Sequence, residues 1–221
     1  TRERPWPALV MPALIVALTL TFTRSAWVGV CVGVSLLFIL KDFRLTGLIP
    51  VVIALLFALA PDRITDRIMS VFDLRDPSSR DRVAMAQTGA AMIKDHPLTG
   101  VGPNMVERVY TQYRDPQGVQ KVNPHLHNVP IQIAAERGLP ALAVWLTFIA
   151  LLATGVFRIF RSGQDHVLAA GALAAIAAML AAGMFEYNFG DSEFLMLFLV
   201  IVTLPFAAQR PDPHAVAARH P

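Results

Sequence analysis

Residues 139–157 read LPALAVWLTFIALLATGVF, a run without a charged side chain. A helix that crosses a bilayer needs about 20 mostly apolar residues, within a range of about 17 to 25. Comparable runs, several of them marginal in length, lie at residues 7–22, 25–40, 47–60, 167–185 and 194–207. Any single run also fits a buried helix of a soluble protein. Their succession favours an all-α fold, a polytopic transmembrane helix bundle of about six spans.

The composition also points to a membrane protein. Apolar residues make up 55% of the chain and charged residues 16%, with a mean hydropathy of +0.52. These values lie outside the range of soluble globular domains. The first apolar run leads into further runs without a cleavage site, so it does not fit a cleavable signal. A single cysteine, Cys31, excludes an internal disulfide.

The basic residues predict the orientation of the spans, because short cytoplasmic loops collect Lys and Arg. If the six runs are spans, most basic residues outside the long polar segment fall on one face of the membrane: Arg2, Arg4, Lys41, Arg44, Arg158, Arg161, Arg210 and Arg219. The short connections on the other face hold Arg24 and, over residues 186–193, no basic residue. We therefore expect both ends in the cytoplasm and the long polar segment outside, in the periplasm of a bacterium. The net charge of +3 follows from this distribution and indicates no nucleic-acid partner.

The same pattern divides the chain into four parts. Residues 1–60 carry the first three spans, and residues 61–138 form a large, helical periplasmic loop between the third and fourth. Residues 139–208 carry the last three spans, and residues 209–221 form a tail whose composition predicts disorder. Because the chain begins with Thr, we expect that it lacks earlier spans.

Two stretches of the loop have clear helix boundaries. Asp76-Pro77-Ser78-Ser79 supplies capping oxygens for a helix start, and His96-Pro97 predicts its end. Further on, Asn128 is a good N-cap and Pro130 is tolerated in a first turn. A helix over residues 129–137 would then end at Gly138, the residue type preferred just past a helix end.

His127 is the leading candidate for a catalytic residue. It precedes the predicted helix, whose positive N-terminal end disfavours a protonated ring. A neutral imidazole is the form that a general base requires. A histidine that only bonds a neighbouring carbonyl is the alternative for His127, and His125 is its rival as the base.

Several motifs resemble the O-antigen ligase/polymerase family of bacterial inner-membrane proteins. The similarity covers about residues 19–157, and its elements occur in the family's order. They are Thr23-Arg24-Ser25-Ala26-Trp27 at the start of a span, Arg82 followed by Met85, Asp95-His96-Pro97-Leu98-Thr99-Gly100-Val101-Gly102, and His127-Asn128 followed after nine residues by Gly138. Family members have a larger bundle, so the resemblance implies that this chain is the C-terminal half and inactive alone.

The resemblance implies a reaction and a set of partners. Its members transfer a glycan from undecaprenyl diphosphate at the periplasmic face, without a metal or another cofactor. The acceptor is lipid A–core in the ligases, another glycan in the polymerases and a protein hydroxyl in related oligosaccharyltransferases. We expect such a donor, such an acceptor and membrane lipids as partners, and a place in the bacterial inner membrane. A transporter for lipid-linked glycans is the non-enzymatic alternative, and a membrane sensor is a third.

Carried onto this chain, the resemblance makes His127 the residue that activates the acceptor hydroxyl, with Asn128, Gly138 and His125 in support. Arg24 and Arg82 would bind the diphosphate, with Arg80 as a rival of Arg82. Guanidinium groups bind phosphate oxygens as a fork and keep their charge. The alternative for Arg24 is a side chain that reaches the lipid headgroups, and for Arg82 a solvated one.

Two positions depart from the family pattern, and one cluster is left over. Ala86 stands where many relatives have tryptophan, and Ala141 stands at a position where the family has a small residue, a hydroxylated residue or tyrosine. Glu186, Asn188, Asp191 and Glu193 form an outward polar cluster that suits a sugar or a cation. A solvated loop is the favoured interpretation, because carboxylates alone do not define a metal site. We therefore predict no metal site.

Overall fold

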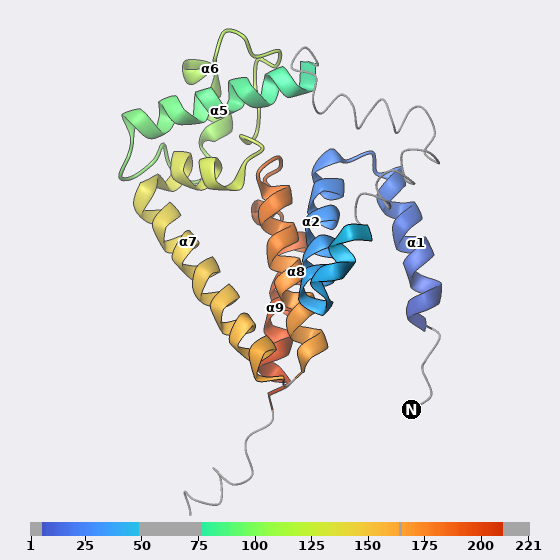
Figure 1. The fold of residues 1–221 in the computed structure, drawn as a ribbon. Coiled ribbons are helices and arrows are strands. Elements are labelled where there is room, and N and C mark those ends of the chain that lie inside the picture. The colour runs from blue at the N-terminus through green and yellow to red at the C-terminus, as the bar shows by residue number, and fades with distance from the viewer. Residues whose placement is uncertain (1–5, 49–76, 164, 210–221) are drawn as a thin grey trace, which may run out of the picture.

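The structure is a computed structural model that describes residues 6–48, 77–163 and 165–209. All regular secondary structure in these ranges is helical, which confirms the all-α prediction (Figure 1). The elements are α1 (Trp6–Leu20), α2 (Arg24–Lys41), η1 (Phe43–Leu48), α5 (Pro77–Asp95), α6 (Val106–Tyr113), α7 (Val129–Ser162), α8 (His166–Gly183), η2 (Asn188–Gly190) and α9 (Ser192–Ala207).

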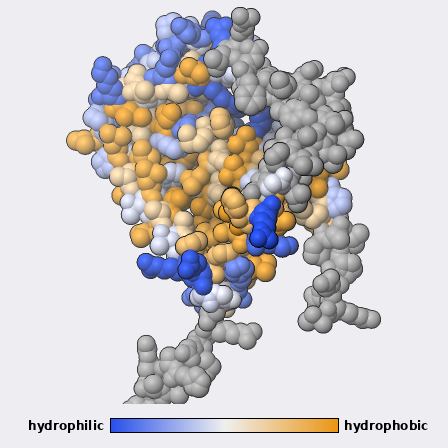
Figure 2. Space-filling model, in the orientation of Figure 1, coloured by the Kyte–Doolittle hydropathy of each residue, from blue (hydrophilic) through white to orange (hydrophobic). Residues whose placement is uncertain are grey.

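Three of these helices, α2, α7 and α8, are long and apolar enough to cross a membrane. α9 and residues Val10–Leu20 of α1 are apolar but shorter. Figure 2 shows a broad apolar band between two polar ends of the molecule. Apolar side chains on α7 are exposed, such as Val144 at 70% exposure and Leu151 at 68%. A membrane helix bundle is thus confirmed. The number of spans stays a prediction, because most of the run at 47–60 lies outside the described residues.

Small residues bring α2 against α8. A Cβ atom added at Gly29 would lie 3.0 Å from the carbonyl oxygen of Ala178, and one added at Gly33 would lie 3.2 Å from that of Ala174. The two glycines are four residues apart and share one face of α2. Such spacing lets two helix backbones approach closely inside a membrane, where packing rather than the hydrophobic effect drives helix association.

Larger side chains fill the space among α7, α8 and α9. The buried members of this core are Val129, Ile133, Trp145, Ile149, Val156, Ile159, Ala169, Ala172, Ile176, Met179, Phe198 and Val202. These side chains lie along the length of the three helices, from the beginning of α7 to near its end. The backbones of α7 and α8 are closest near the end of α7 and diverge toward its beginning (Figure 1).

Helices α5 and α6 lie together across the end of the bundle where α7 begins (Figure 1). Within the described residues, α5 runs from Pro77 to Asp95, which confirms the predicted end before His96-Pro97. The core of the part that contains α5 and α6 consists of Met85, Met92, Val106, Tyr110, Leu126 and Ala135. The Asp81 carboxylate, on α5, accepts hydrogen bonds from the backbone N–H groups of Val119 and Gln120 at 2.9 and 3.1 Å. It therefore fixes the connection that leads toward the histidines.

Helix α7 is broken at Gly138, where φ is 80° and ψ is 170°. The short predicted helix that ends there is confirmed, and a long second half continues from it. Backbone hydrogen bonds join the break to the preceding loop: Val101 N–H donates to Ala135 O at 2.8 Å, and Leu139 N–H donates to Pro97 O at 2.8 Å. A helix end leaves such groups without partners inside the helix. The loop at residues 97–102 supplies them.

Glycine is required at the break for two reasons. Its positive φ is costly for other residues. In addition, a Cβ atom at Gly138 would overlap the carbonyl group of Leu98, which packs directly on the backbone. The family motif glycine therefore acts as a structural residue in this fold.

Candidate functional site

A pocket of about 270 Å³ lies where four segments meet at the end of the bundle where α7 begins. The segments are the start of α2, one face of α5, the residues before α7 and the residues after α8. Its lining comprises Arg24, Ser79, Arg82, Val83, Ala86, Leu126, His127, Asn128, Met184 and Phe185. Four of the residues singled out in the sequence, Arg24, Arg82, His127 and Asn128, thus share one pocket.

Arg24 is the first residue of α2, and it is only 5% exposed. Its guanidinium donates a hydrogen bond to the Ser78 hydroxyl on α5 at 2.8 Å. This burial does not fit a side chain that extends to lipid headgroups. The positive end of the α2 dipole adds to the charge of the guanidinium, so this side of the pocket has a positive potential.

Arg82 and Arg80 occupy different faces of α5, because residues two apart on a helix do not point the same way. Arg82 lines the pocket, whereas Arg80 lies outside its lining. The Arg80 guanidinium points to the connection beyond α6 and donates to the carbonyl oxygen of Gln117 at 3.5 Å. Ala86, one turn after Arg82, also lines the pocket, so a tryptophan there would fill part of it.

Hydrogen bonds on both sides of His127 fix its position. Leu126 N–H donates to the Gln132 side chain at 2.7 Å, and the Asn128 carboxamide oxygen accepts from Ile131 N–H at 2.9 Å. The latter bond confirms Asn128 as the N-cap. The Asn128 amide also donates to Met184 O at 3.0 Å, which ties this segment to the loop after α8. His127 itself has a φ of 48°, in the left-handed region that residues other than glycine rarely adopt.

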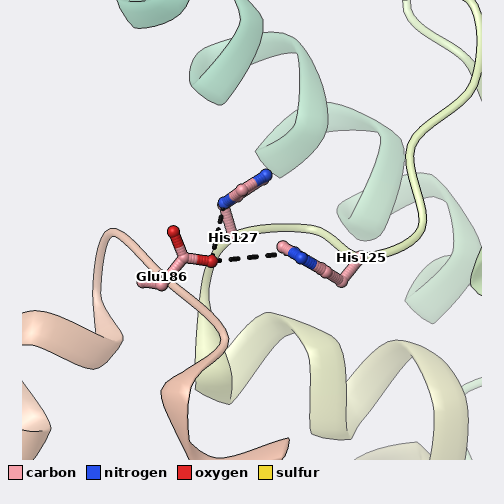
Figure 3. Close-up of side chains that lie close together, drawn as sticks. All are labelled: His125, His127 and Glu186. Atoms are coloured by element: carbon pink, nitrogen blue, oxygen red, sulfur yellow. Dashed lines mark ion pairs between the residues drawn. The ribbon is translucent and has the colours of Figure 1, made fainter. Parts of the chain in front are cut away.

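The hydrogen bond from Asn128 to the loop after α8 places Glu186, in that loop, beside the two histidines (Figure 3). Its Oε1 atom lies 2.8 Å from Nδ1 of His127 and 3.9 Å from Nδ1 of His125. The centroids of the two imidazole rings are 4.1 Å apart. His125, unlike His127, is not part of the pocket lining.

Sequence reasoning missed the role of Glu186, which it treated as one member of a solvated cluster. Its only signal in the sequence is its position as the first carboxylate after an apolar run, at the face predicted for the histidines. The other three residues of that cluster do not lie in this group: Asp191 caps α9 through Phe194 N–H at 3.1 Å, and the Ser192 hydroxyl donates to Glu193 at 3.1 Å. The Asn188 amide donates to Met179 O at 3.2 Å.

The charges of this group shift two pKa values. Burial is the largest influence on Glu186 and raises its pKa, but the contact with His127, the Tyr187 N–H and the charge of His125 together hold that pKa below its usual value. Burial, followed by the charge of His127, lowers the pKa of His125 despite the opposing effect of Glu186. Glu186 is therefore anionic and His125 neutral near pH 7.

An anionic Glu186 favours the tautomer of His127 with the proton on Nδ1, which leaves Nε2 as the basic nitrogen. In Figure 3 the second ring nitrogen of His127 points away from Glu186. The arrangement of carboxylate, imidazole and an open basic nitrogen suits proton abstraction from a hydroxyl group.

A second pocket, of about 460 Å³, lies between α7 and α8 and shares Met184 with the first. Its other lining residues are Val129, Pro130, Trp145, Leu146, Ala177, Met179, Leu180, Ala181 and Gly183. The charged pocket therefore adjoins an apolar space between α7 and α8.

Together, the bundle and its pocket define an integral membrane protein with a cationic, histidine-containing site at one end of its helices. In a comparison with models of known protein families, residues 9–146 match the family described as O-Antigen ligase. This match covers more than half of the chain, and the chain belongs to the O-antigen ligase family. Members of this family are membrane ligases of the glycosyltransferase type, which supports an enzyme in general. A comparison with curated proteins gives no match.

Proposed function

We propose that the protein containing this chain transfers a glycan from undecaprenyl diphosphate to an acceptor hydroxyl of lipid A–core or a similar glycolipid. The observation that carries the proposal is the shared pocket, which Arg24, Arg82 and His127 line together. Such a reaction needs positive groups for the leaving diphosphate and a base for the acceptor, and these three residues supply both.

The arginines act on the leaving group in this proposal. As the bond between the sugar and the diphosphate breaks, negative charge grows on the diphosphate oxygens. Fixed guanidinium groups stabilise this charge most effectively in a pocket that excludes bulk water. The burial of Arg24 and its position at a helix N-terminus favour the role.

His127 acts on the acceptor. The acceptor oxygen forms a bond to the anomeric carbon, and the electron pair of the broken bond stays on the diphosphate. The hydroxyl proton passes to Nε2 of His127, while Glu186 stabilises the imidazolium that results. Glu186 is thus a positioning residue in this scheme, since it acts through the histidine.

Two features support a membrane-bound donor at the outer face. The apolar pocket between α7 and α8 suits the first isoprene units of the carrier lipid, next to the site for its diphosphate. Moreover, Lys41, Arg158 and Arg161 lie toward the ends of α2 and α7 that are remote from the pocket. By the positive-inside rule, those ends belong in the cytoplasm and the pocket outside.

The test is glycan transfer in cells that lack their own ligase. The full-length parent protein is compared with His127→Ala, His125→Ala and Arg24→Ala, at matched membrane levels. His96→Ala serves as the control, because His96 is exposed and outside the pocket. We expect core-linked glycan with the parent and the control, and its loss with His127→Ala and Arg24→Ala.

Two results would contradict the proposal. Full transfer by His127→Ala removes His127 as the base. Longer lipid-linked glycan without any core-linked product identifies a polymerase instead.

A further inference from the structure

We propose that His125, His127 and Glu186 form a binding site for a divalent ion of the zinc class, and that the bound ion inhibits transfer. The binding part stands on the geometry alone. The inhibition part rests on the function proposed above, with His127 as the base.

The three side chains offer their donor atoms at the separations that such an ion needs. One nitrogen or oxygen from each residue lies within 4.8 Å of the others. The Oε1 atom of Glu186 is 2.8 Å from one Nδ1 and 3.9 Å from the other. A tetrahedral zinc ion with bonds of about 2.0–2.1 Å holds its ligand atoms about 3.3–3.4 Å apart. Small side-chain rotations therefore complete the set.

The two imidazole nitrogens are available for this role. Nδ1 of His125 and Nδ1 of His127 are both buried atoms, and both face Oε1 of Glu186, at 3.9 and 2.8 Å. Buried polar atoms normally have a hydrogen-bond partner, and at 3.9 Å Nδ1 of His125 lies beyond hydrogen-bond distance of the carboxylate that it shares with His127. The side chains remain between 28% and 35% exposed, which leaves a path for an ion from solvent.

The surrounding backbone holds the donors in place before an ion arrives. The residue His127 has a left-handed φ of 48°, and its ring centroid lies 4.1 Å from that of His125, with both rings beside Glu186 in Figure 3. The hydrogen bond from Asn128 to Met184 O holds the loop that carries Glu186 against the residues that precede α7, among them both histidines. Tyr187 N–H donates to Oε1 of Glu186 at 3.0 Å and orients the carboxylate. Such supporting bonds are typical of metal sites.

The chemistry of the donors selects the ion. Imidazole nitrogens suit zinc, copper, nickel and iron, whereas magnesium and calcium prefer oxygen ligands. Two histidines and one glutamate, with one position open to water, are a known ligand set for zinc.

Binding at Nδ1 would act directly on the base. A neutral imidazole that is bonded to a metal through Nδ1 carries its proton on Nε2. Nε2 of His127 is then a donor, and it cannot accept the proton of an acceptor hydroxyl. An ion at this site thus inhibits transfer by fixing the wrong tautomer, without occupying the arginine side of the pocket.

Binding is tested on the full-length protein in nanodiscs with Co²⁺, whose visible absorption reports tetrahedral coordination, and then by Zn²⁺ competition. We expect one ion per chain, and affinity that falls by at least about tenfold in His125→Ala and in Glu186→Gln. These variants remove different donors, so misfolding of one leaves the other informative. His96→Ala and His166→Ala keep all three donors and should bind as the parent does. Absence of a cobalt spectrum in the parent, or unchanged affinity in both donor variants, overturns the site.

Inhibition is measured separately on purified protein with a lipid-linked donor. We expect Zn²⁺ to stop transfer by the parent and a chelator to restore it. In His125→Ala, the zinc concentration for half-inhibition, relative to that variant's own zinc-free rate, should rise by at least about tenfold. An active parent that binds zinc and keeps its rate refutes the inhibition while the site stands. A parent that binds zinc but never transfers glycan refutes the proposed function and, with it, the inhibition.

Discussion

Nδ1 of His127 and Oε1 of Glu186 lie 2.8 Å apart, although α7 and α8 separate the two residues in the chain. The contact depends on the packing of the loop after α8 against the residues before α7. The hydrogen bond from the Asn128 amide to Met184 O holds these two segments together. The proposed base is therefore oriented by a residue from a different helical hairpin.

Replacement of that carboxylate should slow the chemical step. Glu186→Gln keeps the size of the side chain but loses the charge that favours the Nδ1 tautomer of His127. We expect kcat to fall by about 10- to 100-fold, with little change in KM for the donor. Steady-state kinetics of the purified protein measure both. Glu193→Gln is the control, because it makes the same substitution at an exposed glutamate. An equal fall in kcat in Glu193→Gln would contradict a specific role for Glu186.

Replacement of Arg24 should separate charge from geometry. Arg24→Lys retains the positive charge but not the planar fork that binds two phosphate oxygens. We expect the donor to bind about tenfold more weakly in Arg24→Lys and about 100-fold more weakly in Arg24→Ala, from the usual strength of hydrogen bonds to charged groups. Binding of undecaprenyl diphosphate to protein in nanodiscs provides the measurement. Arg108→Ala removes an exposed arginine of α6 and should bind normally; equal affinity of all four proteins would exclude Arg24 from the diphosphate site.

A side chain at the break of α7 should destabilise the part of the protein that contains α5 and α6. In Gly138→Ala, the alanine must adopt a positive φ, and its Cβ also overlaps the Leu98 carbonyl. We therefore expect the free energy of unfolding to fall by more than the roughly 1–2 kcal/mol that conformational strain alone costs. Gly163→Ala is a matched control, since Gly163 has a φ of 77° but no atom within 4 Å of an added Cβ. Thermal unfolding in detergent compares the two. If Gly138→Ala lowers the stability no more than Gly163→Ala does, the close approach to Leu98 does not contribute to the cost of the substitution.

A large side chain in the contact between α2 and α8 should separate these helices. Gly29→Leu forces bulk against Ala178 and Ala182, with an expected cost of about 1–3 kcal/mol. Gly171→Leu introduces the same side chain in α8 at a place where an added Cβ meets nothing within 4 Å. Unfolding by denaturant in mixed micelles measures the difference in stability, and equal stability of the two variants would argue against this packing.

The sequence was sufficient for elements that depend on local chemistry. The apolar helices outside residues 47–60, the end of α5 at Asp95, the N-cap Asn128 and the break at Gly138 all follow from side chains close in sequence. The family motifs then singled out Arg24, Arg82 and His127, which the fold brings to one pocket.

Relations between distant segments could not be predicted in this way. Arg80 and Arg82 were rivals because the sequence does not reveal which face of α5 meets the bundle. Glu186 was assigned to a solvated loop because its position beside His127 depends on the packing of α7 against α8. For the same reason, the sequence could not show that two histidines lie beside Glu186.

The break in α7 also has a mechanical consequence. The loop at residues 97–102 holds both sides of the break by main-chain hydrogen bonds, among them Gly102 N–H to Glu136 O at 3.0 Å. The short helix that follows His127 is therefore joined rigidly to the loop and to the top of the long apolar half of α7. A change in the tilt of α7, as a thicker or thinner bilayer would impose, is transmitted through the backbone to the segment that carries the histidine.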